Sequence, residues 1–293
     1  MSLAVITASY ARDFEACRLL CDSMDRYVTG QATHYLVVPQ DDMAAFARLA
    51  GPRRVVVGER ELLKTDLWPV PVRWRGRRYF WAPWMSRPIY GWHLQQLRKI
   101  AMTLAQPEAR VLHVDSDNCF VRPFDAGRLA EGRVPFYVDR GVVDAGLPHH
   151  ATWLRNAHRL LGLAGPRLPA DDYVGQMIVW EKASVAAMTA RIEAVGGRPW
   201  LQAVARAVQF SEYMLYGVAV TADAALQARH EVVTTSPCLT YWDGPALTPH
   251  TLRDFVAGLQ PHQSAIAVQS FVGTRIETIR ALALGEEQVS WPS

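Results

Sequence analysis

The residues best suited to chemistry in this chain are two aspartates one position apart, Asp115 and Asp117, which follow the apolar run 111–114. A short β-branched run that stops at charged residues is typical of a buried strand ending at the edge of a sheet. Ligands of open α/β sheets bind at the carboxyl ends of strands. Paired carboxylates suit a divalent cation that also holds phosphate oxygens. The segment therefore predicts a metal–diphosphate site and favours an enzyme.

Other uses of paired carboxylates are less well matched. A calcium-binding EF-hand loop starting at Asp115 needs Gly and Glu where the chain has Phe120 and Ala126, which excludes it. A haloacid-dehalogenase-like phosphohydrolase, with Asp115 as nucleophile, stays open. Cys119 stands where that pattern has Thr or Val, however, and no later G-D-x-x-x-D follows. A two-metal nuclease would need more carboxylates and a strongly basic face. A solvated turn capped by Asp117 is the plain alternative.

Composition limits the partners. The chain has 293 residues, half of them hydrophobic, and a formal net charge of +3, which is too small to indicate nucleic-acid binding. Basic residues do gather in one stretch: Arg73, Arg75, Arg77, Arg78 and Arg87. Such a stretch could contact phosphates, an acidic lipid surface or only water, so peripheral membrane contact stays open.

Cysteine usage and the termini bear on the compartment. The four cysteines, Cys17, Cys21, Cys119 and Cys238, lack a metal-ligand spacing and fit reduced, buried thiols. We therefore expect a cytoplasmic protein. The first residues predict a strand rather than a signal peptide, and no run approaches the ~20 apolar residues of a transmembrane segment.

The elements that must position the aspartates alternate in type. Strands are expected at 3–6, 34–38 and 53–57, and helices at 13–27 and 41–50. This β-α-β-α-β order predicts an α/β fold with a mostly parallel central sheet covered on both faces. A helix over 92–105 leads into the acidic strand. Further strands are expected at 134–138, 176–180, 232–235 and 265–269, and further helices at 151–161, 183–195, 200–209, 211–216, 251–258 and 274–284.

Between Leu67 and Gly91 the periodicity is lost, and prolines, arginines and tryptophans accumulate. A long irregular segment is usually functional or disordered, and its many aromatic residues argue against disorder. Two interpretations stay open. Trp74, Trp81, Trp84 and Tyr79, with the arginines, could form a lid that closes over a bound donor. Alternatively, the tryptophans only anchor a surface excursion to the core.

The acidic segment resembles the D-x-D segment of GT-A-fold glycosyltransferases. More narrowly, the chain is similar to a bacterial family of unknown function with glycosyltransferase character. The segments that carry this resemblance, besides 111–124, are 7–10, 35–41, 91–99 and 210–217. The resemblance implies one GT-A-type, Rossmann-like α/β/α sandwich over 1–293. Its nucleotide-binding half would be 1–125, and its acceptor-binding half 126–293.

The resemblance also implies roles for individual residues. Asp115 and Asp117 would hold Mn²⁺ or Mg²⁺ on the diphosphate, His262 would complete the metal site, and Glu212 would be the general base. Nucleotide-sugar contacts are expected from Thr7, Ala8, Ser9, Tyr10, Asp41, Gln95, Lys99 and Asp115. Plainer roles are helix capping for Ser9, Asp13 and Asp41 and solvation for Lys99. Asp144, Asp171 and Asp172 are other candidate bases.

Together these observations predict a metal-dependent glycosyltransferase. It would move a sugar from a nucleotide-sugar donor to a glycan or other hydroxyl acceptor, in the synthesis of cell-surface glycan or polysaccharide. The stereochemical course, inverting or retaining, stays open. Besides the phosphohydrolase, a non-catalytic nucleotide- or glycan-binding protein of the same fold is an alternative.

Overall fold

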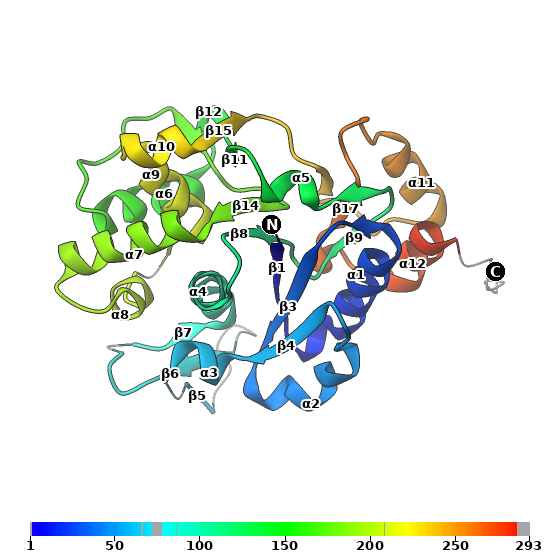
Figure 1. The fold of residues 1–293 in the computed structure, drawn as a ribbon, viewed down its shortest axis with the longest axis horizontal. Coiled ribbons are helices and arrows are strands. Elements are labelled where there is room, and N and C mark those ends of the chain that lie inside the picture. The colour runs from blue at the N-terminus through cyan, green and yellow to red at the C-terminus, as the bar shows by residue number, and fades with distance from the viewer. Residues whose placement is uncertain (1, 66, 72–77, 86, 208, 286–293) are drawn as a thin grey trace.

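The computed structural model describes residues 2–65, 67–71, 78–85, 87–207 and 209–285 (Figure 1). Its centre is a five-stranded sheet in the order β14-β8-β1-β3-β4. These strands are β1 (Leu3–Ala8), β3 (Ala32–Val38), β4 (Arg54–Gly58), β8 (Arg110–His113) and β14 (Ile178–Glu181). All adjacent pairs are parallel except that of the edge strand β14, which runs antiparallel to β8. The expected α/β fold with a mostly parallel central sheet is confirmed.

The sheet is covered on both faces because its central strand is apolar on both. All six residues of β1 are buried, as is usual for a parallel strand between two layers. Leu3 and Val5 share one apolar cluster with Leu20 of helix α1 (Phe14–Tyr27). Ala4 and Ile6 share another with Met102 of helix α4 (Gly91–Ala105). The alternation of side chains along β1 therefore directs the two helices to opposite faces.

A second sheet continues directly from the acidic segment. It has the order β16-β17-β9 and consists of β9 (Asn118–Phe120), β16 (Cys238–Tyr241) and β17 (Ala265–Val268). Strand β17 is parallel to β16 and antiparallel to β9. The last helix, α12 (Ile276–Leu284), lies beside α1, where Tyr27 Oη donates to the carbonyl of Ala283 at 2.7 Å. Strands from the second expected half, β14, β16 and β17, thus join sheets that contain strands of the first half, so the two expected halves are interleaved.

The helices on the left of Figure 1 form the largest apolar cluster. They are α6 (Pro148–Leu160), α7 (Lys182–Gly196), α8 (Trp200–Ala205) and α9 (Glu212–Thr221). Nine consecutive residues of α9, from Glu212 to Val220, are buried, so this helix lies inside the molecule rather than on its surface. Its tyrosines Tyr213 and Tyr216 contact the ring of Trp180, which lies on β14.

The remaining elements are short. They are η1 (Ala11–Asp13), β2 (Val28–Thr29), η2 (Gln40–Asp42), α2 (Met43–Phe46), η3 (Ala47–Leu49), α3 (Glu59–Leu63), β5 (Trp68–Pro69), β6 (Tyr79–Trp81), β7 (Ile89–Tyr90), β10 (Phe124–Asp125), α5 (Gly127–Ala130), β11 (Val134–Tyr137), β12 (Asp139–Val143), β13 (Ala170–Asp172), α10 (Ala224–Arg229), β15 (His230–Val233), α11 (Pro249–Ala257) and η4 (Ser270–Val272). No helix in the described part of the chain is long and apolar enough to cross a membrane.

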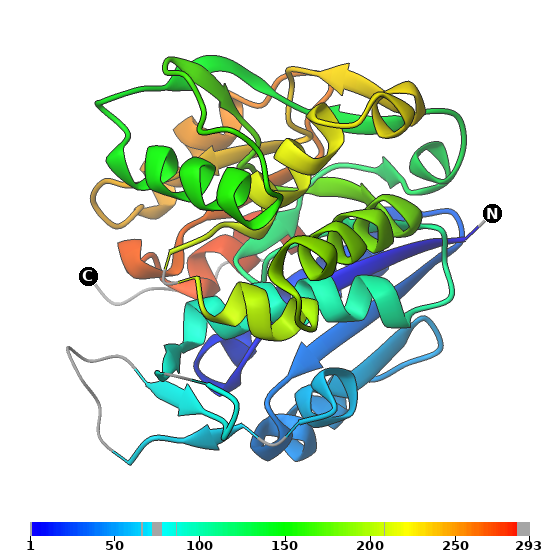
Figure 2. The same ribbon diagram turned by 90° about the vertical axis from the view of Figure 1, so that its left-hand side faces the viewer.

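Three local expectations need correction. The first strand runs to Ala8, so Thr7 and Ala8 lie in the sheet and not in the turn after it. The helix expected over 41–50 is split into η2, α2 and η3. The segment 67–91 is not a single irregular loop, because β5, β6 and β7 pair into a small antiparallel sheet at one corner of the molecule (Figure 2).

Candidate functional site

Asp115 and Asp117 lie where the chain order of the central strands reverses. The chain builds β1, β3 and β4 in one direction and then returns to place β8 on the other side of β1. Such a reversal opens a crevice at the carboxyl ends of the two central strands, where open α/β sheets bind ligands. The two ends are tied together, since Thr7 Oγ1 donates to the carbonyl of Val114 at 2.7 Å. The sheet therefore places the aspartates at its expected binding edge.

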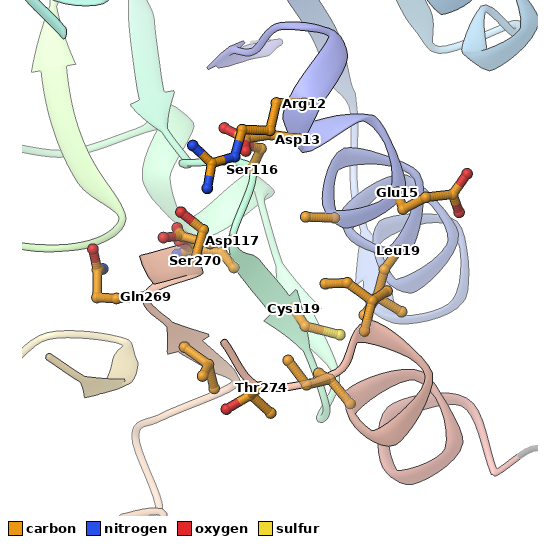
Figure 3. Close-up of a pocket in the computed structure, with 15 residues that line it drawn as sticks. Arg12, Asp13, Glu15, Leu19, Ser116, Asp117, Cys119, Gln269, Ser270 and Thr274 are labelled. Carbon is orange, nitrogen blue, oxygen red and sulfur yellow. The ribbon is translucent and has the colours of Figure 1, made fainter. Parts of the chain in front are cut away.

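A pocket of about 170 Å³ lies beside this edge, between α1, β9, the end of β17 and α12 (Figure 3). We call it the Asp117 pocket. Its polar lining comes from Arg12, Asp13, Glu15, Ser116, Asp117, Asn118, Gln269, Ser270 and Thr274. The rest is apolar and includes Leu19, Cys119, Ile276 and Ile279. An acidic and hydroxyl-rich wall thus faces an apolar one, which is a common composition for a small-molecule site.

Asp117 is the electrostatically unusual residue of the pocket. Its Oδ1 is buried and has no hydrogen-bond partner among the described residues. Burial, and next the charge of Asp115, raise the pKa of Asp117 to about 7, with a smaller contribution from Asp13. Buried polar atoms are normally paired, so an orphaned carboxylate oxygen among like charges indicates a place for a missing cation or donor.

Asp115, two residues earlier, is held firmly. Its Oδ1 lies 2.7 Å from Nζ of Lys99, which lies 3.0 Å from Oε1 of Glu212 and donates to Tyr213 Oη at 2.9 Å. Burial alone would lower the pKa of Lys99, but Asp115, Tyr213 and Glu212 outweigh it and hold that pKa well above its usual value. The ammonium therefore stays charged and fixes the orientation of Asp115.

Helix α9 delivers Glu212 to this buried cluster. Ser211 is its N-cap, with Oγ accepting from the backbone N–H of Met214. The N–H of Glu212 donates to Oε1 of Gln96 on α4 at 3.0 Å. The side chain is enclosed, and burial raises the pKa of Glu212 while Lys99 opposes that rise. Glu212 and Lys99, predicted to face the acceptor and the diphosphate, instead form an internal ion pair beneath Asp115.

Some of the residues expected to contact the nucleotide are used within the fold, and others lie nearer the surface. Thr7 is fully buried, and its hydroxyl is hydrogen-bonded both to the carbonyl of Val114 and to Nε2 of His34, at 3.0 Å, so it is used by the fold. The carbonyl of Ala8 accepts from Gln95 Nε2 at 3.0 Å. Ser9 and Tyr10 follow the strand, and the ring of Tyr10 is 41% exposed. Ser9 is buried at 1% exposed, so Tyr10 is the exposed residue of this turn, and Gln95 is partly buried beside it.

Two predicted residues lie away from the aspartates. Asp41 is exposed in η2, and it is the neighbouring Asp42 whose Oδ2 accepts from the N–H of Ala11, at 2.8 Å. His262 is exposed before the start of β17, whereas Asp117 lies beside its end, where the N–H of Val268 donates to the carbonyl of Asp117. The expectation that His262 completes the metal site is therefore not met, because the whole length of β17 separates the two.

The aromatic segment 67–91 contributes nothing that contacts the pocket in its described part. Arg73, Trp74, Arg75 and Arg77 lie outside the described residues. Trp81 Nε1 donates to the carbonyl of Met85 and Trp84 Nε1 donates to Thr65 Oγ1, both at 3.1 Å. These bonds favour the interpretation as an anchored surface excursion over that as a lid.

Several residues at the edge were not singled out for the site from the sequence. Asp13 follows β1 and lines the pocket, and burial raises its pKa. Gln269 and Ser270 follow β17 and line the same pocket. Met177 precedes β14 in the left-handed region, at φ +57°, a conformation that β-carbon-bearing residues adopt mostly at strained or functional positions. What these residues share is their place in segments that adjoin strand ends at this edge, and this place is the feature of the sequence that could have identified them.

The side chains around Asp115 and Asp117 bear on the divalent metal that the D-x-D resemblance implies. The described residues contain no group of three or more His, Cys, Asp or Glu side chains that could hold a metal alone. Mg²⁺, however, is commonly held by one or two carboxylates while phosphates and water supply the other oxygens. Asp115 and the orphaned Oδ1 of Asp117 fit that pattern. They fit a metal that arrives with a phosphate ligand better than a permanently bound one.

A family model matches residues 1–279 and is described as a family of unknown function, DUF6492. Because the match covers nearly the whole chain, the protein belongs to this family. No curated protein matches the chain.

Proposed function

We propose that the protein is a metal-dependent glycosyltransferase that moves a sugar from a nucleotide sugar to the hydroxyl of an acceptor. One observation carries the proposal: a carboxylate pair lies at the switch-point edge of a parallel sheet, and one carboxylate oxygen, Asp117 Oδ1, is buried without a partner. The strand order and the D-x-D position also support a GT-A type of fold. The acceptor class we propose is a glycan of the cell surface.

In this proposal, Asp115 and Asp117 bind the divalent cation. When bound, the cation would neutralise the charge that develops on the diphosphate as the sugar–oxygen bond breaks. Lys99 holds Asp115 in one orientation through the 2.7 Å contact. The turn after β1 would contact the nucleoside through the exposed ring of Tyr10. Arg12 lines the same pocket and can contact a phosphate oxygen.

The transfer also needs a group that takes the proton of the acceptor hydroxyl. Glu212 was expected in this role, but it is enclosed and bound to Lys99, so an acceptor hydroxyl cannot reach it. Asp13 lines the open pocket, and burial raises its pKa, which makes it a better base than a fully solvated aspartate. We therefore propose that Asp13 accepts the proton of the acceptor hydroxyl.

Thermal unfolding with nucleotides tests the proposal. UDP, GDP and TDP, and the corresponding hexose derivatives, are added with Mn²⁺ or with EDTA. A ligand that binds only the folded protein raises its Tm, and at 100 times Kd it stabilises by about 2.7 kcal/mol. We expect at least one nucleoside diphosphate to raise the Tm with Mn²⁺ and not with EDTA. If none does so, the proposal is wrong.

A phosphohydrolase is the second candidate, since Asp115 is fixed by a lysine and a carboxyl group with a raised pKa, Asp117, follows two residues later. In that reaction Asp115 would attack phosphorus and the leaving oxygen would take a proton from Asp117. Turnover of p-nitrophenyl phosphate with Mg²⁺, lost in Asp115→Asn, would favour this candidate. Release of free sugar from a nucleotide sugar, with no phosphatase turnover, would favour the transferase.

A further inference from the structure

Exposed Phe, Trp and Tyr side chains are rare among the residues that the structure describes, and most of them follow strands that end at one edge. In the described part of the chain four are exposed: Tyr10 at 41%, Trp68 at 52%, Trp242 at 51% and Phe271 at 72%. Tyr10 follows β1, Trp242 follows β16 and Phe271 follows β17. Exposed aromatic surface is unfavourable in water, so exposed rings on segments that adjoin a pocket indicate a surface that is covered in use.

Trp242 and Phe271 are tied to Asp117 through adjacent strands. The parallel pair β16–β17 aligns Tyr241 with Val268, and the N–H of Gln269 donates to the carbonyl of Tyr241 at 3.3 Å. On the other side of β17, the N–H of Val268 donates to the carbonyl of Asp117 at 3.2 Å. Trp242 and Phe271 therefore follow strands that end at the same edge of this sheet, and Asp117 lies at that edge directly before β9.

The two aromatic loops are also held to each other. The N–H of Leu247, after Trp242, donates to Thr274 Oγ1, after Phe271, at 2.9 Å. Tyr241 Oη donates to the carbonyl of Pro245 across Gly244, where an added Cβ would lie 2.2 Å from that hydroxyl oxygen. Gly244 has φ +128°. These contacts fix the loops in the absence of a ligand, and a preformed surface loses less entropy on binding.

The chemistry of this rim suits a sugar ring. Gln269, Ser270 and Thr274 line the Asp117 pocket next to the aromatic loops and offer an amide and hydroxyl groups (Figure 3). A pyranose has one apolar C–H face and a rim of hydroxyls, so it can pack on a flat aromatic ring while its hydroxyls bond to polar neighbours. Tyr10 lies in a different segment, the turn after β1, where the nucleoside is expected.

We infer that Trp242 and Phe271 form the acceptor subsite of the protein and bind a glycan by packing against a pyranose ring. This inference rests on the proposed transferase function, because it takes the Asp117 pocket as the donor site. It adds the place where the proposed glycan acceptor binds, and it requires an intact sugar ring, which a small alcohol or a peptide hydroxyl lacks.

Oligosaccharide binding tests the subsite. The probes are cellobiose, maltose, chitobiose, α-mannobiose and lactose, each observed by saturation-transfer NMR and titrated by calorimetry against the 293-residue chain with UDP and Mn²⁺ present. We expect at least one disaccharide to bind. Trp242→Ala and Phe271→Ala should each weaken it about tenfold, which corresponds to about 1.4 kcal/mol. Trp68→Ala is the matched control, since Trp68 is equally exposed but lies on β5.

The outcomes separate the subsite from the proposed function. Weaker disaccharide binding in the Trp242 and Phe271 variants, with nucleotide binding and Tm unchanged, supports the subsite. Equal losses in Trp68→Ala, or a loss of nucleotide binding alone, would overturn it and assign the rings to nonspecific contact or to the nucleobase. Absence of disaccharide binding by the wild type would also overturn it. Failure of every nucleotide to bind would instead refute the donor site, whatever the disaccharides do.

Discussion

Two segments of this molecule are rich in side chains that could bind a ligand, and they differ in how their polar groups are hydrogen-bonded. The acidic segment 111–124 runs from the central sheet into the second sheet and leaves one buried carboxylate oxygen of Asp117 without a partner. The aromatic segment 67–91 forms its own small sheet, and its indole N–H groups at Trp81 and Trp84 are both hydrogen-bonded. The indole groups of the aromatic segment thus have protein partners, whereas the acidic segment holds several buried polar atoms without a hydrogen bond, among them Oδ1 of Asp117.

The difference shows how a site can be told from a structural motif of similar composition. A buried polar group without a partner costs folding free energy, so a protein keeps one mainly where a ligand supplies the partner. Rings that contact each other, such as Trp68 and Trp81, tilted by 38° with 5.8 Å between centroids, already have protein partners. We therefore expect substitutions in the two segments to affect different properties, binding in one and stability in the other.

The largest effect is expected beneath the acidic segment, at Lys99. Lys99→Met leaves the buried carboxylates of Asp115 and Glu212 without their counter-charge, which should lower the free energy of unfolding by about 3–5 kcal/mol. Urea unfolding measures it. Lys182→Met is the control, because Lys182 is only partly buried and bonds to the carbonyl of Gln106. A loss in Lys99→Met no larger than in Lys182→Met would show that the cluster does not support the site.

The next effect is expected at Asp117 itself. Asp117→Asn removes a buried charge that has like-charged neighbours, so the ligand-free protein should become more stable, by about 1 kcal/mol. The same change should weaken Mn²⁺-dependent nucleoside diphosphate binding about 100-fold. Calorimetry measures the binding, with Asp139→Asn, an exposed aspartate on β12, as control. Lower stability with unchanged binding would make Asp117 a structural residue and remove the contrast between the segments.

A smaller effect is expected at Trp84. Trp84→Phe keeps the ring but loses the hydrogen bond to Thr65 Oγ1, which should lower the free energy of unfolding by about 1 kcal/mol. Nucleotide affinity should not change. A change in affinity with no change in stability would reverse the assignment and make the segment part of the binding site.

The smallest effect is expected at Arg87, whose guanidinium donates to the carbonyl of Arg206 at 3.0 Å. An exposed arginine with one neutral partner contributes little, so Arg87→Ala should leave Tm and nucleotide affinity within error. This variant tests the lid interpretation directly. If nucleoside diphosphate binding weakens more than threefold in Arg87→Ala, the segment contacts the phosphates, and the aromatic segment is a lid after all.

Much of the fold could be predicted from local patterns. The strands around residues 3–8, 34–38 and 110–113 and the helices α1 and α4 follow from apolar runs and helical spacing, which act over a few residues. The order β-α-β-α-β then leaves few topologies, and the observed parallel core is the expected one. The small sheet at 68–90 was missed because its strands, β5, β6 and β7, have only two or three residues each, too few for a period to show.

The site was predictable only in part. Asp115 and Asp117 could be found because a strand pattern ends directly at them. Lys99 and Glu212 were predicted as site residues that face the substrates, but both are buried in an ion pair. The burial of a charged residue cannot be predicted from its neighbours along the chain. Asp13, Gln269 and Ser270 come from distant segments and meet only at the strand edge.

The sequence by itself determined the alternation of elements, the position of the acidic pair at a strand end and the family to which the chain belongs. Tertiary structure decided which carboxylate is neutralised and which is left open. Lys99 lies on α4 and Glu212 on α9, more than a hundred residues apart, and their packing beneath β8 gives Asp115 an ion pair, whereas Asp117 makes none with the described residues. Local patterns set backbone conformation, but charge pairing in a protein interior depends on distances that only the folded chain defines.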